Sequence, residues 1–163
     1  MATTVIVRAR SGRGQRLGFS NVADEHLDVP VQLRWGDMDI NNHINNVQFA
    51  RIFEEARVRS FARWLRHRPA GFSMLVARQE IVFTAVLEYS MEPVTVRSCV
   101  SRIGTTSFNL SLTLIDPDGV TCAVAESTMV SVEPHTGRPT PPPDEVRTIL
   151  ESHLVADAGL PVR

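Results

Sequence analysis

Residues 46–66 read NVQFARIFEEARVRSFARWLR, and their apolar side chains recur every three or four positions. This spacing is the period of an α-helix with one buried face. Because the apolar face is wide and carries Phe and Trp, it predicts a helix packed against a sheet. Asn45 or Asn46 is suited to cap the start of the helix, and HRPAG, residues 67–71, ends it. The apolar positions are Phe49, Ile52, Phe53, Ala56, Phe61, Trp64 and Leu65.

The segments around this helix alternate apolar and polar residues, which is typical of half-buried strands. Asp116-Pro117-Asp118-Gly119 is a strong turn sequence, so the segments on its two sides predict a hairpin. One long helix followed by hairpin-connected strands predicts an α+β fold, in which the helix covers one face of an antiparallel sheet. The predicted strands are residues 3–7, 31–36, 74–87 (as one bent strand or two short ones), 94–101, 108–114 and 120–132.

The length of 163 residues suits one domain, residues 1–163, with enough chain to bury a core. We expect this core within about residues 30–133. The sequence TGRPTPPP, residues 136–143, interrupts the strand pattern, and Asp144 is suited to cap a final helix. Residues 134–163 are therefore expected to form a Pro-rich loop and a C-terminal helix.

Charge and composition argue against several classes of protein. The net charge of −1 does not favour general binding to nucleic acid or to anionic membranes. All 17 basic residues are Arg, which excludes a Schiff-base lysine and a P-loop lysine. No apolar stretch is long enough to span a membrane and no signal peptide is evident, so a cytoplasmic protein is expected. Cys99 and Cys122 lie in apolar strand-like segments, which favours buried free thiols.

A polar cluster, GDMDINNHINN at residues 36–46, precedes the predicted helix and holds two Asp, four Asn and one His. Its D-x-D-x-N spacing resembles the start of a calcium loop. Such a loop also requires Gly and Glu at positions where this chain has Asn42 and Gln48. Asp37, Asp39 and His43 are valid transition-metal ligands, but without a second His or Cys they are a weak metal pattern. The cluster therefore does not predict a metal site.

Two other interpretations of this cluster remain open. Asn and Asp are common in turns and at helix starts because their side chains bond nearby backbone groups. The cluster nevertheless has more polar residues than one turn needs. It also meets the N-terminus of a buried helix, where N–H groups and the helix dipole can stabilise a developing oxyanion. A turn and a catalytic site both fit these residues.

The sequence RWGDMDINNHINNVQFARIFEEAR, residues 34–57, resembles the first strand, loop and helix start of the hotdog-fold acyl thioesterases. These include the 4-hydroxybenzoyl-CoA thioesterase type and the plant acyl-ACP thioesterases. The order of elements agrees over about residues 31–133, including SRIGTTSF and AEST. The resemblance implies an antiparallel sheet wrapped around one long central helix. It also implies a homodimer or homotetramer with active sites between subunits, and no metal or organic cofactor.

The resemblance also implies catalytic roles. Asp39 matches the family's second Asp, a carboxylate that acts as a general base on water or attacks the thioester carbonyl. Asn41 and His43 match the Asn-x-His of the plant-type enzymes, which implies that they orient water, donate to the carbonyl or accept a proton. Those enzymes also carry a downstream Cys. The first Cys here, Cys99, lies in a much later strand, which favours Asp39 with His43 over a Cys–His mechanism.

Other residues of the motif have supporting roles in this interpretation. Asp37 is expected to brace the loop. Asn45 and Asn46 are expected to cap the helix, and neighbouring N–H groups to form an oxyanion hole. Glu54 and Glu55 are expected to be solvated or paired with arginines of the same helix rather than to act as a base.

The substrate carrier would need cationic or backbone partners for its phosphates. Arg102 and Arg138 lie next to predicted turns and are the candidates. Phe49, Phe53 and Phe83 offer an apolar lining that suits an acyl or aryl group, although core packing explains them equally well.

The function implied is hydrolysis of an acyl-CoA or acyl-carrier-protein thioester to a free acid and a thiol. Two alternatives remain. A hotdog-fold hydratase acting on enoyl thioesters uses a D-x-N-P-x-H pattern, from which residues 39–43 differ by one position and by the missing Pro. A protein that binds acyl thioesters without turnover is the other alternative. The sequence leaves the acyl group, its length and the carrier open.

Overall fold

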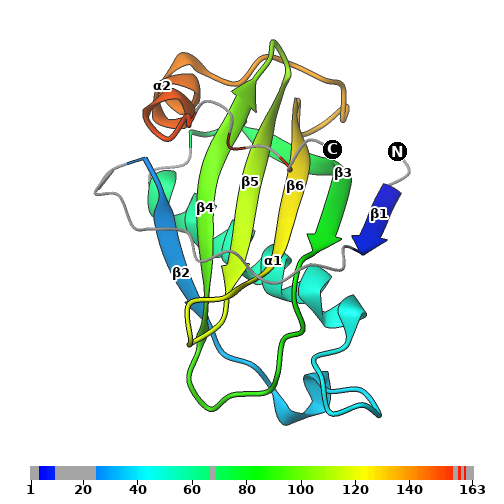
Figure 1. The fold of residues 1–163 in the computed structure, drawn as a ribbon. Helices are drawn as coiled ribbons and strands as arrows, with labels where there is room; N and C mark the ends of the chain where they lie inside the picture. Colours follow the sequence, from blue (N-terminus) through cyan, green and yellow to red (C-terminus); the bar gives the residue numbers. More distant parts are fainter. Residues whose placement is uncertain (1–3, 10–24, 67–68, 156–157, 159, 161–163) are drawn as a thin grey trace.

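The fold is a curved sheet with a long helix on its concave side, in a computed structural model that describes residues 4–9, 25–66, 69–155, 158 and 160 (Figure 1). The strand order is β1-β3-β6-β5-β4-β2; β1 runs parallel to β3 and every other neighbouring pair is antiparallel. The predicted α+β hotdog class is confirmed. The strands are β1 Thr4–Ala9, β2 Leu27–Val31, β3 Ser73–Phe83, β4 Val94–Ile103, β5 Ser107–Ile115 and β6 Thr121–Val132, and the helices are the 3₁₀ helix η1 Trp35–Asp37, α1 Asn46–Trp64 and α2 Asp144–Ser152.

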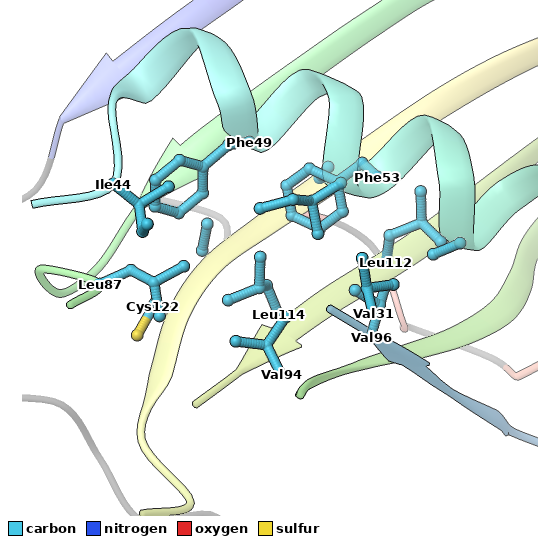
Figure 2. Close-up of a cluster of buried hydrophobic side chains, with 14 of the residues drawn as sticks. Val31, Ile44, Phe49, Phe53, Leu87, Val94, Val96, Leu112, Leu114 and Cys122 are labelled. Atoms are coloured by element: carbon cyan, nitrogen blue, oxygen red, sulfur yellow. The ribbon is translucent and has the colours of Figure 1, made fainter. Parts of the chain in front are cut away.

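Helix α1 buries its apolar face against the sheet, as its periodicity predicts. Phe53 and Ile52 are fully buried there. Figure 2 shows Phe49 and Phe53 pointing from α1 toward side chains of the strands, among them Leu114. Because strand residues alternate between the two faces, alternate residues such as Val94 and Val96 of β4 and Leu112 and Leu114 of β5 enter this first core cluster.

A second core cluster lies around the C-terminal half of α1. Phe61 packs edge-on against Trp64 and Phe108, with ring centroids 5.9 Å apart in both pairs. Val146 and Leu150 of α2 are fully buried in the same cluster. The C-terminal helix therefore closes one end of the core, while the polar cluster of residues 36–46 lies toward the other.

The predicted strand over residues 31–36 is wrong beyond Val31, where β2 ends. The Asp37 carboxylate accepts the Arg34 N–H at 2.8 Å, and the Asp37 N–H donates to the Arg34 carbonyl at 2.9 Å. These local bonds close the turn of η1 in place of sheet pairing. Trp35, expected on the buried face, is 73% exposed.

The remaining strand predictions hold, with adjustments. The segment predicted at residues 74–87 holds one strand, β3 Ser73–Phe83, with an irregularity between Val76 and Arg78, and residues 84–87 lie beyond its end. The hairpin of β5 and β6 is confirmed, and the strand expected at residues 3–7 is β1.

The expected cap of the final helix is wrong by one residue. Pro143 occupies the cap position of α2, and its carbonyl accepts the Arg147 N–H at 2.9 Å. Asp144 is instead the first helical residue, where its charge favours the positive end of the helix dipole.

The two cysteines, Cys99 and Cys122, are free and buried, as expected. Within the described part of the chain, no helix is both long enough and apolar enough to cross a membrane.

Candidate active site

The loop Asp39–His43 is a tight turn that begins at Asp39. The Asp39 N–H donates to the His43 carbonyl at 2.8 Å, and the Asn42 N–H donates to the Asp39 carbonyl at 3.1 Å. Asn42 has a φ of 61°, a left-handed conformation that Asn tolerates better than most residues. The turn projects from the protein, with Ile40 at 97% exposure.

The Asp39 carboxylate is held by groups of its own loop. One oxygen, Oδ1, accepts the Asn41 N–H at 2.7 Å and the His43 N–H at 3.4 Å. The other, Oδ2, accepts the Asn41 side-chain amide at 3.5 Å. The Asn41 N–H bond is the main cause that lowers the pKa of Asp39 below 3.8; burial opposes it, and the His43 N–H, the Asn41 amide and the nearby His43 charge add to it. The carboxylate is therefore ionised at neutral pH.

These bonds confirm the turn interpretation of the polar cluster, and the catalytic interpretation stays a prediction. Asp39 builds the turn, because it accepts the N–H two residues on. It also keeps an ionised carboxylate beside the two residues, Asn41 and His43, with which the sequence grouped it. Turn building does not consume every lone pair of the carboxylate, so it leaves acceptor sites for a water or a substrate.

Asp37 braces the loop from below. It is 3% exposed, and its carboxylate receives Nη2 of Arg51 at 2.5 Å in addition to the Arg34 N–H. Its carbonyl accepts the Asn45 N–H at 2.9 Å. The bracing role expected for Asp37 is therefore present. The sequence did not predict the pairing of Asp37 with Arg51 of α1. The two residues are fourteen positions apart, and only the turn between them brings them into contact.

Asn45 caps α1, with its side-chain oxygen accepting the Val47 N–H at 3.1 Å. Asn46 is the first helical residue and is exposed. Of the two asparagines predicted as candidates for the cap, Asn45 is therefore the one that caps the helix. The loop carrying Asp39 leads directly into this capped N-terminus.

A second segment, residues 84–91, holds the other side of the loop. Ile44 donates to the Leu87 carbonyl at 2.8 Å, and His43 forms an isolated β-bridge with Glu88. Large apolar side chains are exposed on this segment, on the loop and on the adjoining η1 and α1, and Trp35 packs edge-on against Tyr89 with ring centroids 5.4 Å apart. These exposed apolar residues, which we call the apolar rim, are Trp35, Ile40, Val47, Val86 and Met91.

The helix glutamates are ion-paired, as expected. Glu55 lies 3.4 Å from Arg51 and 3.6 Å from Arg59, and Glu54 lies 3.8 Å from Arg57. Neither glutamate is buried. These pairs account for both side chains without a catalytic role.

The two arginines predicted to bind carrier phosphates lie away from Asp39. β4 begins at Val94, which pairs with Val31 just before η1, and Arg102 follows eight residues later. At the rise of a strand, this places Arg102 roughly 26 Å from that end. Arg138 follows β6, which ends at the same end of the sheet as β4 (Figure 1). Within one protomer, neither is grouped with Asp39.

No group of three or more His, Cys, Asp or Glu side chains in the described ranges is arranged to hold a metal ion. The two buried thiols are poorly suited to act as nucleophiles, because burial disfavours the thiolate. Burial raises the pKa of Cys99 to about 11 and that of Cys122 to about 12, with Glu25 and Asp116 adding to the respective shifts.

Comparisons with known proteins show the family and the fold of this chain. The profile of the thioesterase-like superfamily matches residues 33–150. A predicted thioesterase from Bacillus stearothermophilus is 29% identical, with 80% of this chain and 98% of that chain covered and a TM-score of 0.72. A thioesterase from Thermus thermophilus, solved with coenzyme A and Zn, is 26% identical, with 81% and 96% covered and a TM-score of 0.66. No curated protein matches the chain.

A third structure, from the thioesterase superfamily of Jannaschia sp. CCS1, has a TM-score of 0.74 at 21% identity and supports the fold alone. The match covers 86% of this chain and 99% of that chain. The antiparallel sheet around a long central helix defines a hotdog-type thioesterase fold. The chain belongs to the thioesterase-like superfamily, because the family profile matches well over half of it.

Proposed function

We propose that this protein hydrolyses an acyl thioester of CoA or of an acyl-carrier protein to a free acid and a thiol. The observation that carries this proposal is the position of Asp39. Its carboxylate has a lowered pKa and sits in a hydrogen-bonded turn that leads into the capped N-terminus of α1. Membership of the thioesterase-like superfamily supports the same reaction.

Asp39 acts in one of two ways, which share the same products. As a general base it takes a proton from water while the water oxygen attacks the thioester carbonyl carbon; the tetrahedral intermediate then expels the thiolate. As a nucleophile it attacks the carbonyl itself, releases the thiolate and forms a mixed anhydride that water hydrolyses. A depressed pKa keeps the carboxylate available but weakens it as a base.

Asn41 and His43 assist Asp39 in this proposal. Asn41 is exposed and its amide already approaches the carboxylate, so it is placed to orient a water or to donate to the carbonyl. His43 lies on the same turn, and its imidazole is a side chain of the type that serves as a general acid or base. The N-terminal turn of α1, at Asn45 and Asn46, supplies N–H groups and a positive dipole end for the oxyanion.

The proposed assembly is a homodimer or homotetramer. The apolar rim around Asp39 supports it, because side chains such as Trp35 and Met91 are 73% and 79% exposed in the single protomer. Exposed apolar side chains of this size favour a covered interface. Arg102 and Arg138, far from Asp39 within one protomer, are proposed to hold carrier phosphates at a site completed by another subunit.

A thiol-release assay over a panel of acyl-CoA and acyl-carrier-protein substrates tests this function. We expect thiol and free acid in equal amounts from at least one substrate. Loss of enoyl absorbance without thiol would instead indicate the hydratase. Binding of acyl-CoA with no turnover in either assay would indicate a binding protein, and either result would contradict the proposal.

A further inference from the structure

The two core clusters are separated by a level of buried polar side chains. Along α1, the first cluster reaches Ala56 and the second begins at Phe61. Along the strands, residues of the first cluster also give way to residues of the second. In β3, β4 and β6, the residue between the two clusters is polar. The residues at this level, which we call the polar seam, are Arg57, Ser60, Gln79, Ser98 and Ser127.

Each residue of the polar seam has a buried polar atom without a hydrogen-bond partner within the part of the chain that the structure describes. These atoms are Nη1 of Arg57, Nε2 of Gln79 and the hydroxyl oxygens of Ser60, Ser98 and Ser127. Buried polar groups in folded proteins are nearly always paired, and an unpaired one costs about 1–3 kcal/mol. Five at one level of the core therefore indicate a place for a polar partner rather than a packing accident.

Two strand members of the seam lie toward one flank of α1 and the third lies toward the other. Gln79 and Ser127 face each other directly across β3 and β6, whereas Ser98 lies on β4, next to β2. Arg59 reaches the Pro30 carbonyl on β2, so its flank of the helix faces β2. Residues two apart on a helix point about 160° away from each other, so Arg57 points to the opposite flank, toward β6 and β3.

The charge of the seam sets the chemistry of its partner. Arg57 is 7% exposed, and its ion-pair partner Glu54 lies at 3.8 Å, is 66% exposed, and is too distant for a strong hydrogen bond. Burial lowers the pKa of Arg57, and the Glu54 charge opposes this. A buried guanidinium at the same level of the core as an amide N–H and hydroxyls offers a set of donors that suits an anionic acceptor. Because Glu54 is exposed, the guanidinium lies just beneath the surface.

We infer that the polar seam binds a carboxylate at the far end of the acyl group, so that the preferred substrate is an ω-carboxyacyl thioester. This inference rests on the proposed hydrolysis at Asp39. Arg57 is eleven residues along α1 from Asn46, roughly 16 Å at the rise of a helix, and helix side chains lean back toward the N-terminus. The seam is therefore within reach of an extended acyl chain whose thioester lies at Asp39.

In this account the substrate carboxylate replaces Glu54 as the partner of Arg57. Two variants should therefore act in opposite directions. Arg57→Met removes the cation and should weaken carboxylate recognition. Glu54→Gln removes the competing carboxylate and should strengthen it. A purely structural role of Arg57 predicts no such opposition.

The test compares octanoyl-CoA with suberoyl-CoA, which has the same chain length and ends in a carboxylate. For the full-length protein we expect kcat/KM to be at least about 10-fold higher for suberoyl-CoA. Arg57→Met should abolish this ratio, chiefly through KM for suberoyl-CoA, and Glu54→Gln should widen it. Arg63→Met, an exposed arginine of the same helix, is the matched control and should leave the ratio unchanged.

Binding of the non-hydrolysable thioether analogues of both substrates separates this inference from the proposed function. If suberoyl binding depends on Arg57 but no thioester is hydrolysed, hydrolysis fails and the seam stands. If both substrates are hydrolysed equally, or Arg57→Met lowers both equally, the inference is wrong and hydrolysis stands. If Arg57→Met does not fold, Gln79→Leu takes its place. If the inference is correct, Gln79→Leu should lower the suberoyl-to-octanoyl ratio and Glu54→Gln should raise it. If it is wrong, neither variant should shift the ratio.

Discussion

The buried Asp37 carboxylate is joined to Arg51 of α1 at 2.5 Å, and this pair ties the polar loop to the central helix. Asp37 is 3% exposed, and its carboxylate is bound by Arg51 and by the Arg34 N–H. The carbonyl of the same residue accepts the Asn45 N–H, which sets the start of α1. The ion pair therefore controls the position of the turn that carries Asp39.

Replacing Arg51 with Met should lower the free energy of unfolding by about 2–3 kcal/mol, because it leaves a buried carboxylate without its cation. Urea unfolding of the wild type and of the variant measures this. Glu55→Gln is the control, since it removes the exposed partner of the same arginine at 3.4 Å and should cost less than about 1 kcal/mol. Equal losses in the two variants would contradict a special role for Asp37.

Removal of the helix cap should also be measurable. Asn45→Ala deprives the Val47 N–H of its acceptor and should cost about 1 kcal/mol, whereas Asn45→Ser should retain most of the stability. Asn46→Ala, one residue inside the helix, should change stability by less than about 0.5 kcal/mol. A larger loss for Asn46→Ala than for Asn45→Ala in thermal unfolding would show that the cap is assigned to the wrong residue.

The cysteines should be inert in the folded protein. Burial raises the pKa of Cys99 to about 11 and that of Cys122 to about 12, so little thiolate exists near pH 8. Reaction with a thiol reagent should be slower in the native state than in denaturant by a factor on the order of 100. Cys99→Ala and Cys122→Ala should retain thioesterase activity, and loss of activity in a folded variant would revive a Cys–His mechanism.

The pH dependence of kcat/KM should separate Asp39 from His43. The folded-state pKa of Asp39 lies below its ordinary value of 3.8, so the ionised form, and any stability it adds, is present above the ordinary value and is lost only as pH falls through the lowered pKa. If Asp39 alone acts as the base, kcat/KM should stay flat down to about pH 4. A fall in kcat/KM that already begins at a higher pH and that vanishes in His43→Gln would assign the base to His43 instead.

Much of the fold follows from local patterns in the sequence. The three- to four-residue spacing of Phe49, Phe53 and Ala56 predicts α1, and the Asp116–Gly119 turn predicts the β5–β6 hairpin, because each signal lies within the element that it specifies. The same holds for Asn45 as a cap.

The errors arise where a side chain overrides the local pattern. Residues 31–36 alternate like a strand, but the Asp37 carboxylate bonds the Arg34 N–H and turns the chain. The polar seam was also not predictable. Gln79, Ser127 and Arg57 are distant in sequence, and only the strand register and the path of α1 bring them to one level of the core.

The most direct test of the central claim compares two substitutions of Asp39. Asn preserves the side-chain oxygen that accepts the Asn41 N–H, so Asp39→Asn should keep the turn and the melting temperature, whereas Asp39→Ala loses that bond. If Asp39 is catalytic, thiol release should fall by roughly 100-fold or more in both variants. Asp118→Asn, in the exposed turn after β5, is the matched control and should be fully active. Near-normal turnover by a folded Asp39→Asn protein would show that Asp39 only shapes its loop.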